Sequence, residues 1–275
     1  MDTQDLRPAA VAGHFYSADA GKLSVQVETF LAEVEAEPGP AKAVIAPHAG
    51  LVYSGQCAAH VFGRVTIPPI VVILAPNHTG RLKSAGGASL WGRGAFETPL
   101  GRIAVAEGFA AELEARCSLV EHDPLAHRDE HAVEVELPFL AVMAPQSAIV
   151  PIVLAWDDWE SSKLLAEALA GLVAEASQDV LLVASSDMTH FESAGSAAEK
   201  DRIALDAVVQ LDGEGLINAC QRERITMCGR APAAVAIEAA RRLGAERVEV
   251  VDYRHSGWVT GDDSSVVAYA GVTIS

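Results

Sequence analysis

The chain has 275 residues, a formal net charge of −17 and an apolar content of 50%. This apolar content is enough to form a sizeable hydrophobic core, so we expect a globular protein. The excess of carboxylates repels nucleic-acid phosphates and anionic lipid headgroups, and no cluster of Lys and Arg offsets it locally. Nucleic acid and membrane are therefore not expected as partners.

Two further features of the sequence lead us to expect a cytoplasmic protein. The sequence has no uninterrupted apolar run of about eighteen residues, and its start, "MDTQDLRPAAVAGHFY", carries acidic residues where a secretory signal has basic ones. No CxxC pair occurs among the four cysteines, which are Cys57, Cys117, Cys220 and Cys228. This spacing indicates neither a disulfide framework nor a zinc knuckle, so any functional thiol acts singly.

The chain alternates between two hydrophobic patterns. Short apolar runs rich in Val and Ile predict buried strands at residues 43–46, 70–75, 148–154, 179–184, 247–252 and 265–273. Apolar positions three and four residues apart predict helices at residues 21–35, 107–116, 134–142, 160–177, 196–211 and 231–243. The alternation predicts an α/β fold with a mixed, mainly parallel sheet and helices on both faces.

Residues 84–104 interrupt this alternation. They are rich in Gly and Ser and contain a possible hairpin around "TPLG", so we expect an excursion over the sheet. We predict a single domain over residues 1–275. The alternative is a split near residue 145, which limited proteolysis would reveal as two stable halves.

Histidines recur where predicted strands end. His48 follows the run at 43–46 through Pro47, and His78 follows the run at 70–75 through Pro76 and Asn77. The stretch "SSDMTHF" adds Asp187 and His190 after a third strand. Because ligands of open parallel sheets bind beyond the carboxyl ends of the strands, we expect these four side chains to converge.

Two imidazoles on rigid strand ends, together with an anionic ligand, are a common way to hold a divalent transition metal with positions left open. The spacing leaves two anions possible. Asp187 is one. Cys228 is the other, because it precedes a helix, and a helix N-terminus favours a thiolate.

A third histidine cluster lies in "HRDEHAVEVELPFL", residues 127–140. The spacing places His127 and His131 on one helix face, and likewise His131 and Glu134. In HExxH zinc proteases the Glu directly follows the first His, whereas in "HRDEH" Glu130 directly precedes the second, so we reject a protease. Either His131 and Glu134 support a site, or they form a structural polar pair at a helix start. We expect no specific role for His127.

Seven stretches, in this order and spacing, carry a resemblance that spans nearly the whole chain: "RPAAVAGHFY", "APHAGLVYSG", "LAPNHTG", "DEHAVEVELPFL", "SSDMTHF", "CGRAP" and "HSG". Together they resemble the Memo family, whose bacterial members are called AmmeMemoRadiSam system protein B. The resemblance implies a fold similar to the catalytic subunits of class III extradiol ring-cleaving dioxygenases, which contain a mononuclear non-haem iron(II).

The resemblance also implies roles for individual residues. His48, His78 and Cys228 match the two histidines and the cysteine of the Memo pocket, where the ring-cleaving enzymes have a glutamate as third ligand. Asp187 and His190 match the other pocket residues, His190 resembling the dioxygenase acid/base histidine. His131 matches the histidine of the family's "EHS" segment, although Ala132 follows it here. A thiolate is softer than a carboxylate and changes the metal preference of the site.

Two functions follow as hypotheses. The first is an oxidoreductase that uses iron(II), or else zinc or copper, and O₂ on a small aromatic or heterocyclic molecule, with Asp187, His131 and His190 as catalytic residues. The second is a metal-binding or ligand-binding adaptor that kept the scaffold without turnover. The family name further implies a radical-SAM protein and AmmeMemoRadiSam system protein A as partners.

Overall fold

A nine-stranded mixed sheet lies at the centre of the computed structural model, which describes residues 5–275. Its strands are β2 (Ala43–Ala46), β3 (Ile70–Pro76), β4 (Ala88–Leu90), β7 (Val120–His122), β8 (Ala148–Leu154), β9 (Val180–Ser185), β10 (His190–Glu192), β11 (Val248–His255) and β12 (Val266–Ile274). They are ordered β10-β12-β2-β9-β3-β8-β4-β7, and β11, outside this order, also pairs with β12. A smaller sheet joins β1 (Leu6–Arg7), β5 (Ala95–Thr98) and β6 (Gly101–Ala104).

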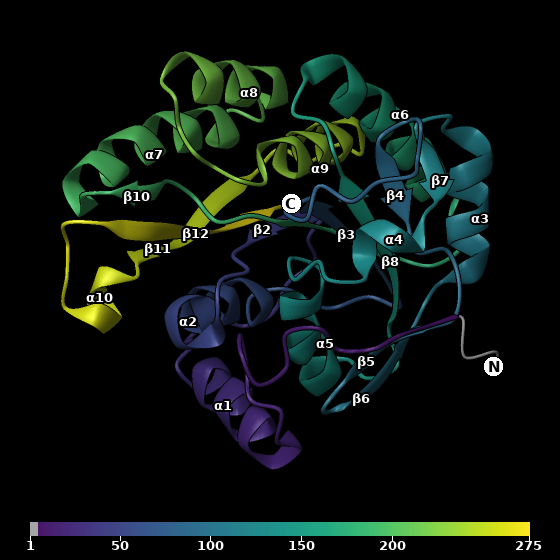
Figure 1. Cartoon of the computed structure of the whole chain (residues 1–275). Helices are drawn as coiled ribbons and strands as arrows, with labels where there is room; N and C mark the ends of the chain where they lie inside the picture. Colours follow the sequence, from purple (N-terminus) through teal and green to yellow (C-terminus); the bar gives the residue numbers. More distant parts are fainter. Residues whose placement is uncertain (1–4) are drawn as a thin grey trace.

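Helices cover both faces of the large sheet (Figure 1). They are α1 (Ala20–Ala32), α2 (Leu51–Phe62), α3 (Glu107–Arg116), α4 (Pro124–His127), the 3₁₀ turn η2 (Glu134–Glu136), α5 (Leu137–Met143), α6 (Trp159–Glu175), α7 (Ala194–Val209), α8 (Gly213–Arg222), α9 (Arg230–Arg242) and α10 (Gly257–Thr260). On one face α9 packs against β2, β3 and β9, with α6 and α8 beside it. On the other face α2 packs against β2, β11 and β12, with α1 below it.

The predicted α/β class, with a mixed sheet and helices on both faces, is confirmed. The parallel part is narrower than expected: β2, β9, β3 and β8 run parallel, but β12 and β4 flank them antiparallel. The central strands are buried on both sides and read as continuous apolar runs, whereas the direction of a flanking strand leaves no mark in its own sequence.

The segment at 84–104 contributes more than an excursion over the sheet. The predicted hairpin is confirmed, since β5 and β6 pair Thr98 with Gly101. However, Ala88–Leu90 forms β4 and joins the large sheet beside β8.

Strands from before and after residue 145 alternate in the large sheet, with β8 beside β3 and β9 between β2 and β3. The single-domain organisation itself stays a prediction.

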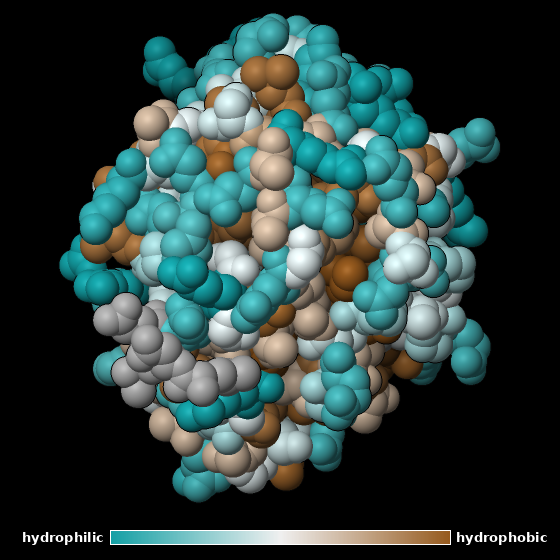
Figure 2. Space-filling model, turned by 90° about the vertical axis from the view of Figure 1, so that its right-hand side faces the viewer, coloured by the Kyte–Doolittle hydropathy of each residue, from teal (hydrophilic) through white to brown (hydrophobic). Residues whose placement is uncertain are grey.

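The surface is mixed in hydropathy. Figure 2 shows the face on the right of Figure 1, where hydrophilic side chains predominate and hydrophobic ones lie between them. Among residues 5–275, no helix is both long and apolar enough to cross a bilayer.

Candidate metal centre

The carboxyl ends of three parallel strands meet at one edge of the sheet and carry the predicted residues. His48 lies two residues beyond β2, His78 two beyond β3, and Asp187 two beyond β9. Because β9 lies between β2 and β3, Asp187 emerges between the two histidines. The strand-end argument therefore places these three residues correctly along the edge.

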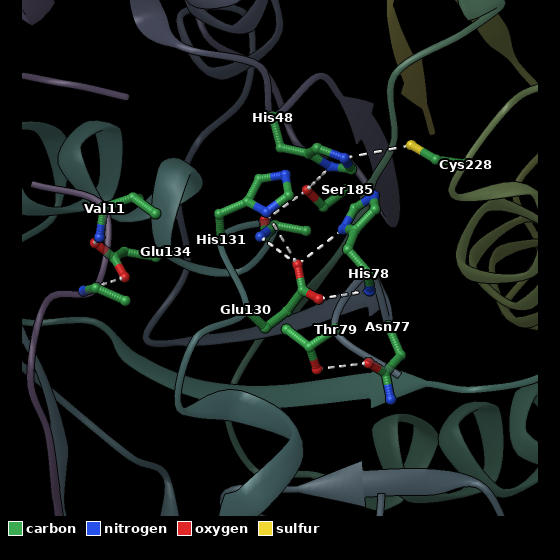
Figure 3. A network of polar contacts seen from close by, with 12 residues as sticks. Val11, His48, Asn77, His78, Thr79, Glu130, His131, Glu134, Ser185 and Cys228 are labelled. Carbon is green, nitrogen blue, oxygen red and sulfur yellow. Dashed lines mark hydrogen bonds and ion pairs between the residues drawn. The ribbon is translucent and has the colours of Figure 1, made fainter. Parts of the chain in front are cut away.

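His131 joins the two strand-end histidines. It lies in the loop between α4 and η2, and the three imidazoles each offer a nitrogen within 4.8 Å of the others (Figure 3). The ring centroids of His78 and His131 are 4.5 Å apart, and that of His48 lies 5.2 Å from His78 and 5.3 Å from His131. Such a group has the size and the donor type that hold a transition-metal ion.

Each of these imidazoles has a polar neighbour at Nδ1. Nδ1 of His78 is 2.9 Å from Oε1 of Glu130, and Nδ1 of His131 is 3.4 Å from the same oxygen. Nδ1 of His48 is 2.8 Å from Oγ of Ser185. A metal-binding imidazole characteristically donates its other N–H in this way, which leaves the three Nε2 atoms as candidate metal ligands, with Sγ of Cys228 beside that of His48.

The buried Glu136 fixes the tautomer of His48 through Ser185. Oγ of Ser185 lies 2.7 Å from the carbonyl of Ala132 and 2.7 Å from Oε1 of Glu136. Burial raises the pKa of Glu136 to about 8, so its carboxyl is protonated at neutral pH. The carbonyl can only accept, so the hydroxyl donates to Ala132 and accepts from Glu136 and from Nδ1–H of His48.

Replacing Glu136 by glutamine should remove part of the pH dependence of stability. The folded chain keeps a proton on Glu136 up to about pH 8, whereas an ordinary glutamate loses it near 4.5. The contribution of this group to stability is therefore complete below about pH 4.5 and falls, by up to about 1.4 kcal/mol per pH unit, until about pH 8. Urea midpoints between pH 5 and 8, measured with a chelator present, should fall less in Glu136→Gln than in the parent.

Glu160→Gln is the matched control, because Glu160 is exposed at the start of α6. It should keep the parent's pH dependence. If Glu136→Gln keeps it too, Glu136 is ionised in the folded protein and does not donate to Ser185.

Burial disfavours the charged form of two imidazoles in the cluster, those of His48 and His131. Burial lowers the pKa of His48 well below its ordinary value, and the nearby imidazoles of His78 and His131 lower it further. Burial also lowers the pKa of His131. For Glu130, burial works in the opposite direction, but the hydrogen bond and charge of His78 outweigh it and the pKa is lowered. A neutral imidazole beside an ionised carboxylate is the protonation state that a metal ion requires.

Cys228 and Asp187 both lie against His48. Sγ of Cys228 is 3.3 Å from Nε2 of His48 and 3.3 Å from the backbone N of Asp187, which donates to it. Burial raises the pKa of the Cys228 thiol, and the Asp187 carboxylate adds to the rise. The effect of burial on the pKa of the thiol is therefore larger than the stabilisation of a thiolate by the N-terminus of α9. A metal ion bound here would have to displace the thiol proton.

The carboxylate of Asp187 is engaged by backbone groups. Its Oδ1 accepts the N–H of His48 at 2.8 Å and that of Ala49 at 3.3 Å. Burial raises its pKa to about 6, although the His48 N–H works against the rise. Asp187 therefore holds the turn that carries His48.

His190 borders a pocket beside the cluster. The backbone carbonyl of Thr226 accepts from Nδ1 of His190 at 3.0 Å, which leaves Nε2 of His190 as a proton acceptor. His190 lines a cavity of about 400 Å³ together with His131, Asp187 and the aromatic residues Phe15, Tyr53, Phe191 and Tyr269. All three residues predicted to be catalytic thus face one pocket.

Comparison with known proteins shows which family the chain belongs to. The model of the Memo-like protein family matches residues 7–273. The chain belongs to the Memo-like family. It is similar to MEMO1 family proteins of Aquifex aeolicus, at 40% identity over 97% of this chain and 98% of the relative, and of Methanopyrus kandleri, at 38% over 97% and 98%. A MEMO1 family protein of Methanothermobacter thermautotrophicus is 37% identical over 96% and 99%.

In this Memo-like protein, Glu134 contacts the N-terminal segment. Its carboxylate pairs with the buried Arg7 and accepts the N–H groups of Ala10 at 2.8 Å and Val11 at 3.0 Å. The hydroxyl of Tyr16 also donates to it, at 2.5 Å. Glu134 thereby ties down the segment that carries Phe15 to the pocket, and its role is to build the pocket wall.

Sequence reasoning missed three supporting residues of the site, namely Glu130, Ser185 and Glu136. Glu130 directly precedes His131 in "DEH", and Ser185 ends the strand that delivers Asp187. An acidic residue beside a predicted histidine is a signal that could have found Glu130. Nothing in the sequence marks Glu136, which reaches His48 only through Ser185.

Proposed function

We propose that this Memo-like protein is a metal-dependent oxidoreductase that uses O₂ on a small aromatic or heterocyclic molecule. Nε2 of His48, His78 and His131 would hold the metal, with Cys228 as an additional soft donor beside His48. The observation that carries the proposal is that each Nδ1 already faces a polar neighbour while the three rings lie close together, which leaves one nitrogen of each ring to share one ion.

Iron(II) is the metal that we propose, with zinc or copper as alternatives, since imidazole and thiolate suit all three. When bound, iron supplies Lewis acidity and exchanges electrons with O₂. Glu130 would support a bound metal ion in two ways. Its carboxylate would offset part of the positive charge of the ion, and it orients the imidazoles of His78 and His131.

The proton chemistry would fall to His190. Its Nδ1–H is held by Thr226, so Nε2 takes a proton from the substrate and returns it to the product. The cavity wall formed by Phe15, Tyr53 and Tyr269 would exclude water around the substrate ring. Asp187 would keep His48 in place, and its carboxylate in the same cavity would tune the basicity of His190.

The test uses protein purified without air or an affinity tag and loaded with iron(II). O₂ uptake is then measured against a panel of catechols and related heterocycles. The parent should consume O₂ with at least one member. His190→Ala should lower kcat by about 100-fold or more with unchanged iron content, because general acid–base catalysis has that magnitude. His60→Gln on α2 is the control and should match the parent.

An iron-saturated parent that consumes no O₂ would contradict the oxidoreductase and favour the adaptor. The adaptor should keep partner binding in His190→Ala. The partners proposed are a radical-SAM protein and AmmeMemoRadiSam system protein A, and co-purification of each with the parent tests them.

Cytoplasmic localisation is part of the proposal. A reducing compartment agrees with the free thiols of four cysteines, which are Cys57, Cys117, Cys220 and Cys228.

A further inference from the structure

One residue at the pocket has a backbone conformation that no helix end explains. Three non-glycine residues among 5–275 have positive φ: Phe191 at 59°, Leu211 at 55° and Arg224 at 53°. Leu211 follows the last turn of α7, and Arg224 follows that of α8. Their next residues donate back to Ala207 and Cys220, as in the common left-handed ending of a helix. Phe191 lies in a strand.

The backbone around Phe191 is held from both sides. The pairing of β10 with β12 shifts register between His190 and Glu192, so Phe191 occupies a bulge. The N–H of His190 donates to Oγ1 of Thr226 at 2.8 Å, and the side chain of Lys200 pairs with Glu192. A strained conformation persists only where its surroundings fix it, and bulges beside sites commonly redirect a side chain.

The bulge directs Phe191 to the rim of the pocket. Its side chain is 78% exposed, yet it lines the same cavity as His190 and Asp187. Its ring lies 5.7 Å from that of His190 in an edge-to-face arrangement. Left-handed φ, broken strand pairing and an exposed aromatic ring each cost free energy in the ligand-free chain, and one bound molecule under the ring would offset all three.

The composition of the wall indicates the class of that molecule. Phe, Tyr and Trp form 5% of the chain but four of the fourteen residues that line the cavity. We infer that Phe191 is a specificity-determining residue that covers a planar aromatic ring held in this pocket, an inference that rests on the proposed function for the role of that ring as substrate. Aromatic rings pack favourably on one another beyond the area they bury.

The test compares Phe191→Gly and Phe191→Leu with Leu211→Gly. Both glycine variants relieve a positive φ and should stay folded. Phe191→Gly should keep the parent's Tm, whereas Leu211→Gly also removes a side chain packed against the core and should have a lower Tm. Zinc-loaded protein is titrated with 4-nitrocatechol, and metal-free protein with 2-naphthol followed by its fluorescence. Phe191→Gly should bind both probes about fivefold or more weakly, Phe191→Leu should be intermediate, and Leu211→Gly should bind like the parent.

Affinities of Phe191→Gly within about twofold of the parent for both probes would overturn the inference and leave Phe191 as an exposed contact for another protein. A parent that binds neither probe would overturn it too. Zinc content reports separately on the proposed function: if the parent holds no zinc, the metal site is wrong, and the 2-naphthol titration still decides the role of Phe191.

Discussion

Replacing His131 by alanine should lower the zinc affinity of this Memo-like chain by more than about 100-fold. Loss of an orienting neighbour alone costs about 10- to 100-fold, and His131 would be a ligand. Its imidazole is fixed between the ring of Phe15, 4.7 Å away, and that of His78. Competition with a chromophoric chelator gives the affinity. Glu130→Gln is the graded comparison and should lose about 10- to 100-fold, since it removes the charge that orients His78 and His131.

The same titration with Cys228→Ser decides the contribution of sulfur. A cobalt(II) form of the parent should show a sulfur-to-metal charge-transfer band that the serine variant lacks, and affinity should fall at acid pH as protons compete for the donors. The serine variant should lose less zinc affinity than His131→Ala. If His131→Ala binds zinc like the parent and Cys228→Ser does not, the ligands are His48, His78 and Cys228, as the family resemblance implies. If only Asp187→Asn loses zinc, the third ligand is a carboxylate.

The residues that the sequence places best are those on the central strands. His48 and His78 follow apolar runs that end in proline, and a parallel sheet brings such ends to one edge whatever their separation in the chain. Asp187 follows for the same reason. These positions depend on strand assignment, which is read from buried apolar runs, and on parallel pairing, which the alternation of strand and helix patterns predicts.

Spacing could not place His131 beside His48 and His78. It lies in a loop whose path is set by long-range contacts, since Glu130 accepts from the backbone of His78, and its own carbonyl accepts from Arg7. Helical spacing paired His131 with Glu134, yet Glu134 faces the N-terminal segment. The bulge at Phe191 was invisible for a related reason: its conformation depends on Thr226, 35 residues away in sequence and held in the loop before α9.

Replacing Glu134 by alanine should destabilise the protein by about 3–5 kcal/mol, the usual cost of removing one partner of a buried ion pair. Arg7 and Glu134 are both buried. The other hydrogen-bond acceptors of Arg7 among the described residues are the carbonyls of His127, Pro8 and Glu130, and its guanidinium lies 5.2 Å from the ring of Phe96. The free energy of unfolding in urea measures the effect. Glu97→Ala is the matched control, because its ion pair with Arg102 is exposed and should contribute about 1 kcal/mol or less.

A double variant separates charge from anchoring in this pair. Arg7→Met with Glu134→Leu removes both charges together, which relieves the uncompensated guanidinium and should recover part of the lost stability. Recovery should stay incomplete, because the N–H groups of Ala10 and Val11 and the hydroxyl of Tyr16 still lack their acceptor. A loss of stability below about 1 kcal/mol in Glu134→Ala would contradict the buried pair.

The zinc affinity of the double variant reports on the pocket wall formed by the N-terminal segment. If the anchored segment fixes Phe15 against His131, the zinc affinity falls even though every proposed ligand is intact.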